Sequence, residues 1–413
     1  MTVRELAQSA KAASGKLSIT SAQTRNDALL AMADALFAAA PSILAANAED
    51  VKNARACNVK ESFIDRLTLD QKRIEGMASG MKKVALLHDP IGKSDSVTVH
   101  PNSMRIEKRR VPLGVIGIIY EARPNVTADA IALCMKSGNA CVLRGGSEAL
   151  LSNIAITDAL SEAAVKSGIP DGAIQLLRDT DRATAAEMMK LNGLIDVLIP
   201  RGGAGLIQSV VQQATIPVIE TGSGVCHVYI DETADLNMAA DIIENAKCSR
   251  PSVCNAAETL LVHSAVAKDC LPQIAERLTA RGVELRCDAR AKALMPGSID
   301  ATQEDWSTEY NDLILSVKVV DSFDEAVAHI ETYGTHHSDA IVTSLITTAE
   351  RFLNEVNSAA VYVNASTRFT DGEEFGFGAE IGISTQKIHA RGPMGLDELT
   401  TVKYTVRGSG QIR

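Results

Sequence analysis

Between residues 111 and 363 the chain alternates short apolar runs with amphipathic stretches, and this alternation limits most strongly what it can fold into. Runs such as "VPLGVIGIIY" and "ACVLRG" are rich in β-branched residues and are typical of buried strands. The stretches between them, such as "TADAIALCMKSG", carry apolar residues at helical spacing. Strands that alternate with helices predict a doubly wound parallel sheet, which binds ligands at the carboxyl ends of its strands.

The alternation occurs twice, once before and once after a polar segment that contains Cys254. A chain of 413 residues also exceeds the size at which one core stops growing. We therefore predict two α/β domains that meet near Cys254, preceded by helices over residues 1 to about 90. Interdomain clefts are where substrates usually bind.

Charge and cysteine content exclude several classes of protein. The formal charge of -10 argues against a nucleic-acid partner. The 8 cysteines are scattered without a CxxC pair, which favours reduced thiols over disulfides or a metal site. The most apolar early stretch is broken by Asp34 and Pro41, and the N-terminus has no signal-peptide pattern. We expect a cytoplasmic protein with no membrane partner and no metal.

Cys254 is the candidate nucleophile. It lies in "SRPSVCNAAETLLVH", after a polar approach bent by proline, whereas Cys134 lies inside an apolar run as a structural thiol does. Glu220 lies at the carboxyl end of an expected strand, "IPVIE", where a carboxylate could act as a base or cap the glycine loop. Asn125 follows another strand and could donate to an oxyanion or cap a helix.

Two further positions could bind an anion. Gly202 and Gly203, in "PRGGAGL", follow an expected strand and open a helix, so that their amides could approach a phosphate; the alternative is a tight turn. Arg144 ends the strand "ACVLR", where a guanidinium could pair with a ribose 2′-phosphate or simply lie in solvent.

Several long segments together resemble the aldehyde dehydrogenase superfamily and, within it, the γ-glutamyl phosphate reductases. They are "YEARPNVTADA", "GNACVLRGGSEA", "VIETGSGVCHVYID", "VDSFDEAVAHIETYGTHHSDAI" and "FGFGAEIGISTQKIHARGPMGLDELTTVKY". The resemblance implies NADPH-dependent reduction of L-glutamyl 5-phosphate to L-glutamate 5-semialdehyde and phosphate, a step of proline biosynthesis. Cys254 would form the thioester, with Asn125 and the amide of Cys254 as donors to the oxyanion.

The same resemblance assigns other positions. Arg144 stands where the superfamily has a lysine near the adenosine ribose, Glu309 matches the carboxylate that holds the nicotinamide ribose, and Glu220 matches the base that activates water in hydrolytic relatives. Phe-Gly-Pro, which usually follows the ribose carboxylate, is replaced here by "NDL". We expect an arginine to bind the glutamyl end of the substrate and select Arg368.

The resemblance also implies an architecture, an aldehyde dehydrogenase-like α/β fold with a β-ribbon oligomerisation flap. We predict a cofactor-binding domain over 1–93 and 113–226, a catalytic domain over 227–392, and a flap over 94–112 and 393–413. The flap predicts a homo-oligomer, a dimer or larger. Whether a glutamate kinase associates to deliver the acyl phosphate stays open.

Two other functions remain as alternatives. One is a hydrolytic NAD(P)-dependent aldehyde dehydrogenase, in which Glu220 would activate water. The other is a cysteine hydrolase or acyltransferase without nicotinamide, in which a histidine such as His227 would activate Cys254.

Overall fold

The computed structural model describes residues 1–59, 61–121 and 123–413. The chain forms two compact units, which are described one at a time. The first unit comprises Met1–Thr221, Gly376–Gly382 and Met394–Arg413, and the second comprises Gly222–Phe375 and Ile383–Pro393.

The first unit begins with helices, as the sequence predicts. Thr2 starts the first of them with a capping box, in which its hydroxyl accepts from the amide of Glu5 and the Glu5 carboxylate accepts from the amide of Thr2. Ser21 and Asp70 cap two others through their side chains. These helices are α1 (Val3–Leu17), α2 (Ala22–Ala38), α3 (Ala40–Ala56), α4 (Glu61–Leu67) and α5 (Gln71–Leu86).

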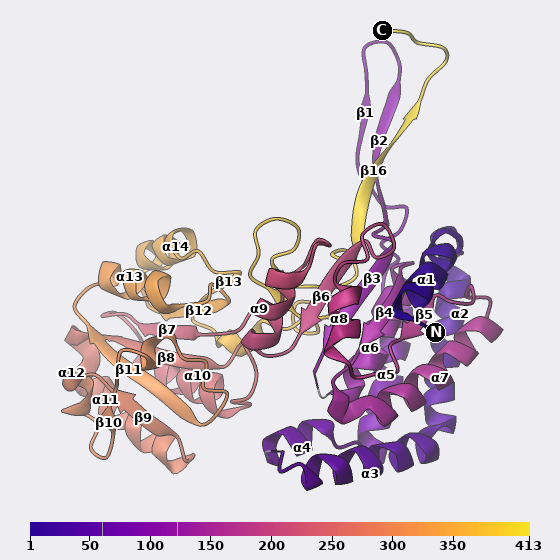
Figure 1. Cartoon of the computed structure of the whole chain (residues 1–413). Helices are drawn as coiled ribbons and strands as arrows, with labels where there is room; N and C mark the ends of the chain where they lie inside the picture. The colour runs from indigo at the N-terminus through magenta and orange to yellow at the C-terminus, as the bar shows by residue number, and fades with distance from the viewer. Residues whose placement is uncertain (60, 122) are drawn as a thin grey trace. The chain divides into compact units, whose positions relative to one another are not determined.

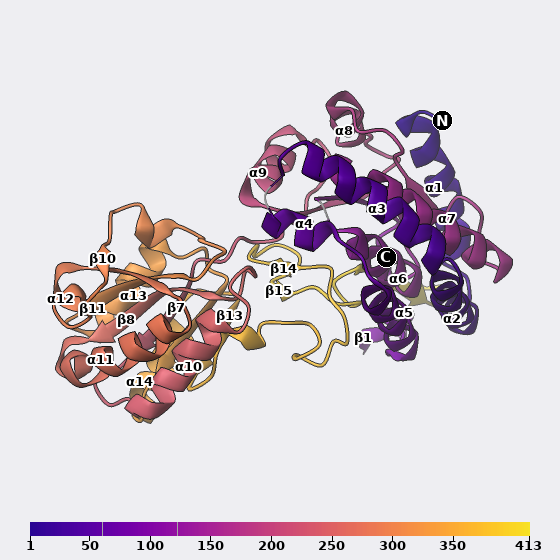
Figure 2. The same ribbon diagram turned by 90° about the horizontal axis from the view of Figure 1, so that it is seen from below.

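A parallel sheet of order β5-β4-β3-β6 forms the centre of the first unit (Figure 1). Strands β4 and β5 lie on one side of β3 and β6 lies on the other, so the strand order reverses between β3 and β6, the position where doubly wound sheets bind ligands. Helix α3 packs along α7 at the edge of the unit (Figure 2). The elements are β3 (Val115–Tyr120), α6 (Pro124–Lys136), β4 (Ala140–Arg144), η1 (Ser147–Ala149), α7 (Leu150–Lys166), β5 (Ile174–Leu176), α8 (Arg182–Met188), β6 (Val197–Arg201) and α9 (Ala204–Gln213).

The strand expected over "IPVIE" does not form. The segment meets β6 only through an isolated bridge between Leu198 and Val218, flanked by bonds from the amide of Leu198 to Pro217 and from the amide of Ile219 to Leu198. Proline cannot donate to a ladder, and this limits how far such a strand extends. Glu220 consequently lies in a loop at the end of the first unit and not at the end of a strand.

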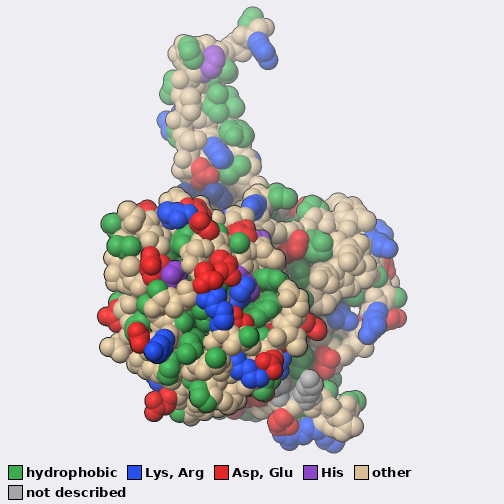
Figure 3. Space-filling view, turned by 90° about the vertical axis from the view of Figure 1, so that its left-hand side faces the viewer, with side chains coloured by type: hydrophobic (Ala, Val, Ile, Leu, Met, Phe, Trp, Pro, Cys, Tyr) green, Lys and Arg blue, Asp and Glu red, His purple; other side chains and the backbone are tan. Residues whose placement is uncertain are grey.

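An antiparallel sheet of order β1-β2-β16 projects from the first unit, with the C-terminus near its tip (Figure 1). Its strands are β1 (Ser94–Val99), β2 (Arg105–Pro112) and β16 (Thr400–Arg407). Hydrophobic side chains lie on the surface of this ribbon (Figure 3), with Val99 68%, Tyr404 66% and Val406 56% exposed. The two predicted flap segments thus pair with each other, through β2 and β16.

The second unit is built on a parallel sheet of order β10-β9-β11-β8-β7-β12-β13. Its elements are β7 (Cys226–Ile230), α10 (Leu236–Cys248), β8 (Ala257–His263), α11 (Ser264–Ala280), β9 (Glu284–Cys287), α12 (Ala289–Lys292), β10 (Ile299–Asp300), η2 (Asp305–Ser307), β11 (Ile314–Val320), α13 (Phe323–Tyr333), β12 (Ser338–Val342), α14 (Ile346–Glu355), β13 (Ala360–Val363) and η3 (Thr367–Phe369). A short antiparallel pair, β14 (Ile383–Ser384) and β15 (Gly392–Pro393), completes it.

Helices cover both faces of this second sheet, and its strands are apolar on both sides for that reason. Val228 and Ile230 of β7 face the core formed with α10 and α11, whereas Tyr229 between them faces the core formed with α13 and α14 (Figure 1). Successive residues of a strand point to opposite faces, so one strand supplies both cores. The predicted fold class, two doubly wound α/β domains, is confirmed.

The boundaries of the units differ from those of the predicted domains, and the predicted flap segments, apart from Pro393, belong to the first unit. The long N-terminal segment of the first unit ends at Thr221 and not at residue 226; Cys226 already pairs with Ala257 in the second sheet. Residues 376–382 join the first unit, where Met394 binds them through backbone hydrogen bonds. Among the described helices, no single one is long and apolar enough to cross a bilayer; one pair, α2 with α3, would pass together but is bent by 64°.

Candidate active site

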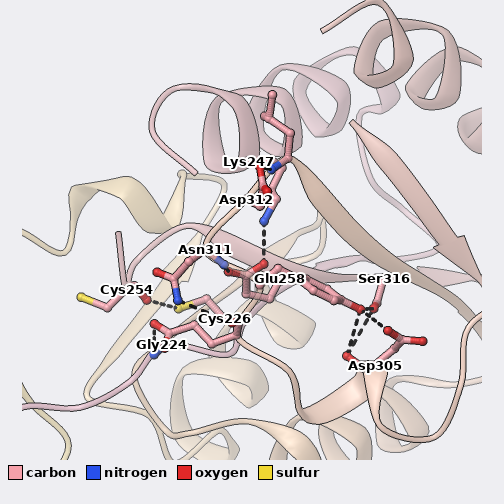
Figure 4. Close-up of polar contacts among 12 residues, drawn as sticks. Gly224, Cys226, Lys247, Cys254, Glu258, Asp305, Asn311, Asp312 and Ser316 are labelled. Carbon is pink, nitrogen blue, oxygen red and sulfur yellow. Dashed lines mark hydrogen bonds and ion pairs between the residues drawn. The ribbon is translucent and has the colours of Figure 1, made fainter. Parts of the chain in front are cut away.

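Cys254 lies in the loop between α10 and β8 and is half-buried, whereas Cys134 is completely buried within α6. The thiol of Cys226, at the start of β7, donates to the carbonyl oxygen of Cys254 over 3.2 Å (Figure 4). Burial raises the pKa of the Cys226 thiol well above its usual range, so this thiol keeps the proton that it donates. The backbone of the candidate nucleophile is thereby fixed from the adjacent strand.

Gly224 brings a second backbone segment against the same loop. A Cβ atom on Gly224 would lie 1.5 Å from the carbonyl oxygen of Cys254, so no other residue fits there. The amide of Gly224 donates to Oε1 of Glu309 over 2.9 Å. The structure thus brings Glu309 to the segment that packs on the cysteine loop, although the sequence alone does not predict this contact.

Arg368 also reaches the cysteine loop. Its Nε donates to Oγ of Ser249 over 3.1 Å, and its Nη1 bonds to Oδ1 of Asn255, the residue after Cys254. Burial lowers the pKa of Arg368, and the neighbouring charge of Arg250 adds to this effect. The second unit therefore gathers a half-buried thiol, a carboxylate and two guanidinium groups around one loop.

Asn255 ties the loop to the segment that carries Arg368. Its Nδ2 donates to the carbonyl oxygen of Thr370 over 2.9 Å, and its own carbonyl oxygen accepts from Oγ1 of Thr367 over 2.7 Å. Arg368 and Cys254 are thus held by one connected set of hydrogen bonds.

A buried ion pair lies at the base of the cysteine loop. Nζ of Lys247 and Oε2 of Glu258 are 2.5 Å apart, and the side chains are 0% and 1% exposed (Figure 4). Burial raises the pKa of Glu258 and lowers the pKa of Lys247, because each charged form loses its hydration. Sequence reasoning missed this pair; the signal was a glutamate inside the apolar run "NAAETLLVH".

His227 does not fit the alternative in which a histidine activates Cys254. Its side chain is completely buried, and its Nδ1 lies 3.0 Å from Oδ1 of Asp339 on β12. Its ring stacks edge-on against His329 of α13 with centroids 5.6 Å apart. His227 therefore belongs to the core beneath α13, while Cys226, its neighbour in the strand, contacts the cysteine loop.

In the first unit, the glycine loop follows β6 and opens α9 with Gly203 at the N-cap position, as predicted. The amide of Gly203 donates to Oε2 of Glu121 over 3.0 Å, and a Cβ on Gly202 would lie 2.6 Å from the carboxyl carbon of Glu121. The protein's own carboxylate thus occupies one donor that a phosphate would use. The binding of a cofactor by Gly202 and Gly203 stays a prediction.

Arg144 ends β4, the strand beside β3, and is half-buried. Its Nη2 lies 3.4 Å from the carbonyl oxygen of Thr180. Its Nε is buried and has no hydrogen-bond partner in the part of the chain that the structure describes. A buried donor without an acceptor is costly, and an anionic ligand at the strand ends would satisfy it.

Asn125 lies in the first turn of α6 and is exposed. Its Nδ2 donates weakly to Oδ2 of Asp129, over 3.3 Å. Burial raises the pKa of Asp129 to about 6, which the Asn125 amide and the charge of Arg201 partly offset. Asn125 and Glu220 belong to the first unit, and their predicted contributions to the chemistry at Cys254 remain predictions.

Comparison with known proteins agrees with this fold. The model of the aldehyde dehydrogenase family matches residues 1–313, so the chain belongs to that family. An acetylating aldehyde dehydrogenase from Geobacillus thermoglucosidasius, 18% identical, shares the fold with a TM-score of 0.71 over 100% of this chain and 97% of that one.

Two relatives with higher sequence identity are both named gamma-glutamyl phosphate reductase. The gamma-glutamyl phosphate reductase of Caldanaerobacter subterraneus subsp. tengcongensis is 59% identical over 413 residues, which cover 100% of both proteins. The crystal structure of gamma-glutamyl phosphate reductase from Thermotoga maritima matches with a TM-score of 0.97 at 48% identity over 100% of both chains. The resemblance found in the sequence is confirmed.

Proposed function

We propose that this chain is a cytoplasmic, NADPH-dependent reductase that converts L-glutamyl 5-phosphate to L-glutamate 5-semialdehyde and phosphate in proline biosynthesis. The observation that carries the proposal is the 59% identity, over the whole of both chains, to a protein named gamma-glutamyl phosphate reductase. The half-buried thiol of Cys254, with Arg368 bonded to both sides of its loop, supports it.

The thiolate of Cys254 attacks the acyl carbon of the substrate. The bond from that carbon to the phosphate oxygen breaks, phosphate leaves, and a thioester to Cys254 forms. When bound, NADPH supplies the hydride that reduces the thioester carbon. The carbon–sulfur bond then breaks, which releases the semialdehyde and restores the Cys254 thiolate. Asn125 and the amide of Cys254 are the proposed donors to the oxyanion.

Arg368 and Arg250 supply positive charge beside the nucleophile. The substrate carries an α-carboxylate and a phosphate, and guanidinium groups bind both in a bidentate way. In a protein with a formal charge of -10, such anions need a local source of positive charge. Arg368 is the proposed ligand of the glutamyl end.

The residues of the first unit suit a nicotinamide dinucleotide. The buried Nε of Arg144 lacks a partner among the described residues and lies at the carboxyl end of β4, beside the position where the strand order reverses. We propose that Arg144 binds the 2′-phosphate and that Gly202 and Gly203 approach the pyrophosphate. Glu309, in the second unit, is the proposed partner of the nicotinamide ribose.

The phosphate requirement of the reverse reaction tests the proposal. With glutamate semialdehyde and NADP⁺ at saturation, the formation of NADPH should need inorganic phosphate, because phosphate must attack the thioester on Cys254. We expect a rate that saturates with phosphate and nearly vanishes without it. Cys254→Ala should abolish turnover but still quench NADPH fluorescence on binding, and Cys248→Ala is the matched control.

The same assay separates the two alternatives. A rate that is indifferent to phosphate and is lost in Glu220→Gln would make water the acceptor and the protein a hydrolytic aldehyde dehydrogenase. Failure of NADPH to bind at all would favour a cysteine hydrolase or acyltransferase.

A further inference from the structure

The ion pair of Lys247 and Glu258 closes the loop that carries Cys254. Lys247 lies in the last turn of α10, before the loop, and Glu258 lies in β8, after it. Withdrawing two charges from water is costly, and apolar residues of similar volume often serve stability as well or better. Stability alone therefore gives no reason for this pair.

The second oxygen of Glu258 holds the segment that carries Glu309. Oε1 of Glu258 accepts from the amide of Asn311 over 3.3 Å (Figure 4). Asn311 adopts a φ of 56°, a left-handed conformation that residues other than glycine seldom adopt. Tyr310 lies between Glu309 and Asn311 in the chain, and the Nζ of Lys247 is 5.9 Å from the centre of its ring.

Glu309 reaches the cysteine loop from the other side. Its carboxylate accepts from the amide of Gly224, and Gly224 lies against the carbonyl oxygen of Cys254. The contacts thus form a closed ring that runs from the base of the loop, through Glu258 and Glu309, back to Cys254.

We propose that Lys247 and Glu258 are positioning residues, which couple the Glu309 carboxylate to the loop that bears Cys254. Neither side chain is placed to touch the reacting atoms. The inference rests on the proposed function, because Glu309 and Cys254 take their assignments from it. When the pair is lost, the binding of the nicotinamide ribose and the reactivity of the thiol should change together.

The test compares the single variant Glu258→Leu with the double variant Lys247→Met/Glu258→Leu. The single variant leaves a buried cation without its carboxylate and should lower the melting temperature. The double variant replaces both charged side chains by apolar ones of similar size, so it should recover most of the lost melting temperature. It also removes the acceptor of the Asn311 amide. We expect both variants to lose about tenfold in kcat/KM and to bind NADPH more weakly, about the loss from one hydrogen bond to a charged group.

A second measurement is the rate at which iodoacetamide alkylates Cys254, followed by peptide mass mapping. This rate requires no substrate, so it tests the positioning of the loop even if the proposed function fails. We expect it to change about threefold in both variants, a change of about 0.6 kcal/mol in barrier. The control is Lys318→Met/Glu325→Leu, which removes a more exposed pair of the same types, 3.4 Å apart in the second unit, and should change neither quantity.

A double variant that recovers stability together with wild-type kcat/KM and wild-type alkylation would overturn the proposal and make the pair purely structural. If the double variant does not fold, Glu258→Leu alone decides by the same two measurements. Altered alkylation in a protein that shows no phosphate-dependent reaction would support the positioning and reject the proposed function.

Discussion

At the scale of single residues, glycines and buried polar atoms define the candidate site. Gly224 allows the backbone before β7 to touch the loop of Cys254, and Gly202 leaves space for the carboxylate of Glu121. Arg144 has a buried Nε that lacks a partner among the described residues.

Arg144→Ala should weaken the binding of NADPH by on the order of 1–3 kcal/mol, the range for hydrogen bonds to a charged group. The binding of NADH should change little, because it has no 2′-phosphate. Fluorescence titration with the two cofactors measures both values on the same variant. Equal losses for NADPH and NADH would mean that Arg144 stabilises the end of β4 and does not bind the 2′-phosphate.

At the scale of elements, α13 packs on the second sheet through a buried histidine. His329 contacts Trp306, His227 and Tyr333 with its ring, at centroid distances of 5.4, 5.6 and 4.6 Å. Burial is the main reason that the pKa of His329 is lowered to about 3, and the neighbouring His227 and Lys318 contribute less to that lowering. The helix is thus held to the sheet by a ring that must stay neutral.

The burial of His329 predicts that the stability of the folded protein falls in acid. In the unfolded chain His329 titrates near 6.5, so between pH 6.5 and 3 the unfolded state binds a proton that the folded state does not. Stability from this group is complete above pH 6.5 and falls by roughly 1.4 kcal/mol for each pH unit below it. In His329→Leu, urea titrations from pH 7 to 5 should show a shallower loss than in the wild type. Parallel losses would assign the acid sensitivity to other groups.

At the scale of the whole molecule, the β1-β2-β16 ribbon exposes hydrophobic side chains and unpaired strand edges, which proteins normally cover. Tyr404 and Val406 are two residues apart in β16, so their side chains lie on the same face of the strand. We predict that this ribbon mediates self-association.

Tyr404→Glu/Val406→Glu should therefore shift the protein from a dimer or larger species toward a monomer, because charge on the face opposes its burial. Sedimentation velocity measures the shift, and circular dichroism checks the fold. The control is Ile346→Glu, at a hydrophobic residue of α14 that is 77% exposed. A monomeric wild type, or an unchanged mass in the double variant, would contradict the prediction.

The sequence by itself determined the layered α/β architecture, because the period of its apolar residues states locally which segments are strands and which are helices. It also distinguished Cys254 from Cys134, because the polar or apolar neighbours of each thiol lie next to it in the chain. The resemblance of long segments to a known family then supplied the chemistry, which no local pattern does.

Only the tertiary structure decided which groups meet across long separations in the chain. In the folded chain Lys247 pairs with Glu258, the Gly224 amide donates to Glu309, and the Gly203 amide donates to Glu121. The tertiary structure also reduced "IPVIE" to a single bridge. The physical reason is that such contacts depend on where folded backbones approach and on which polar groups are left to satisfy one another, and neither is a property of local sequence.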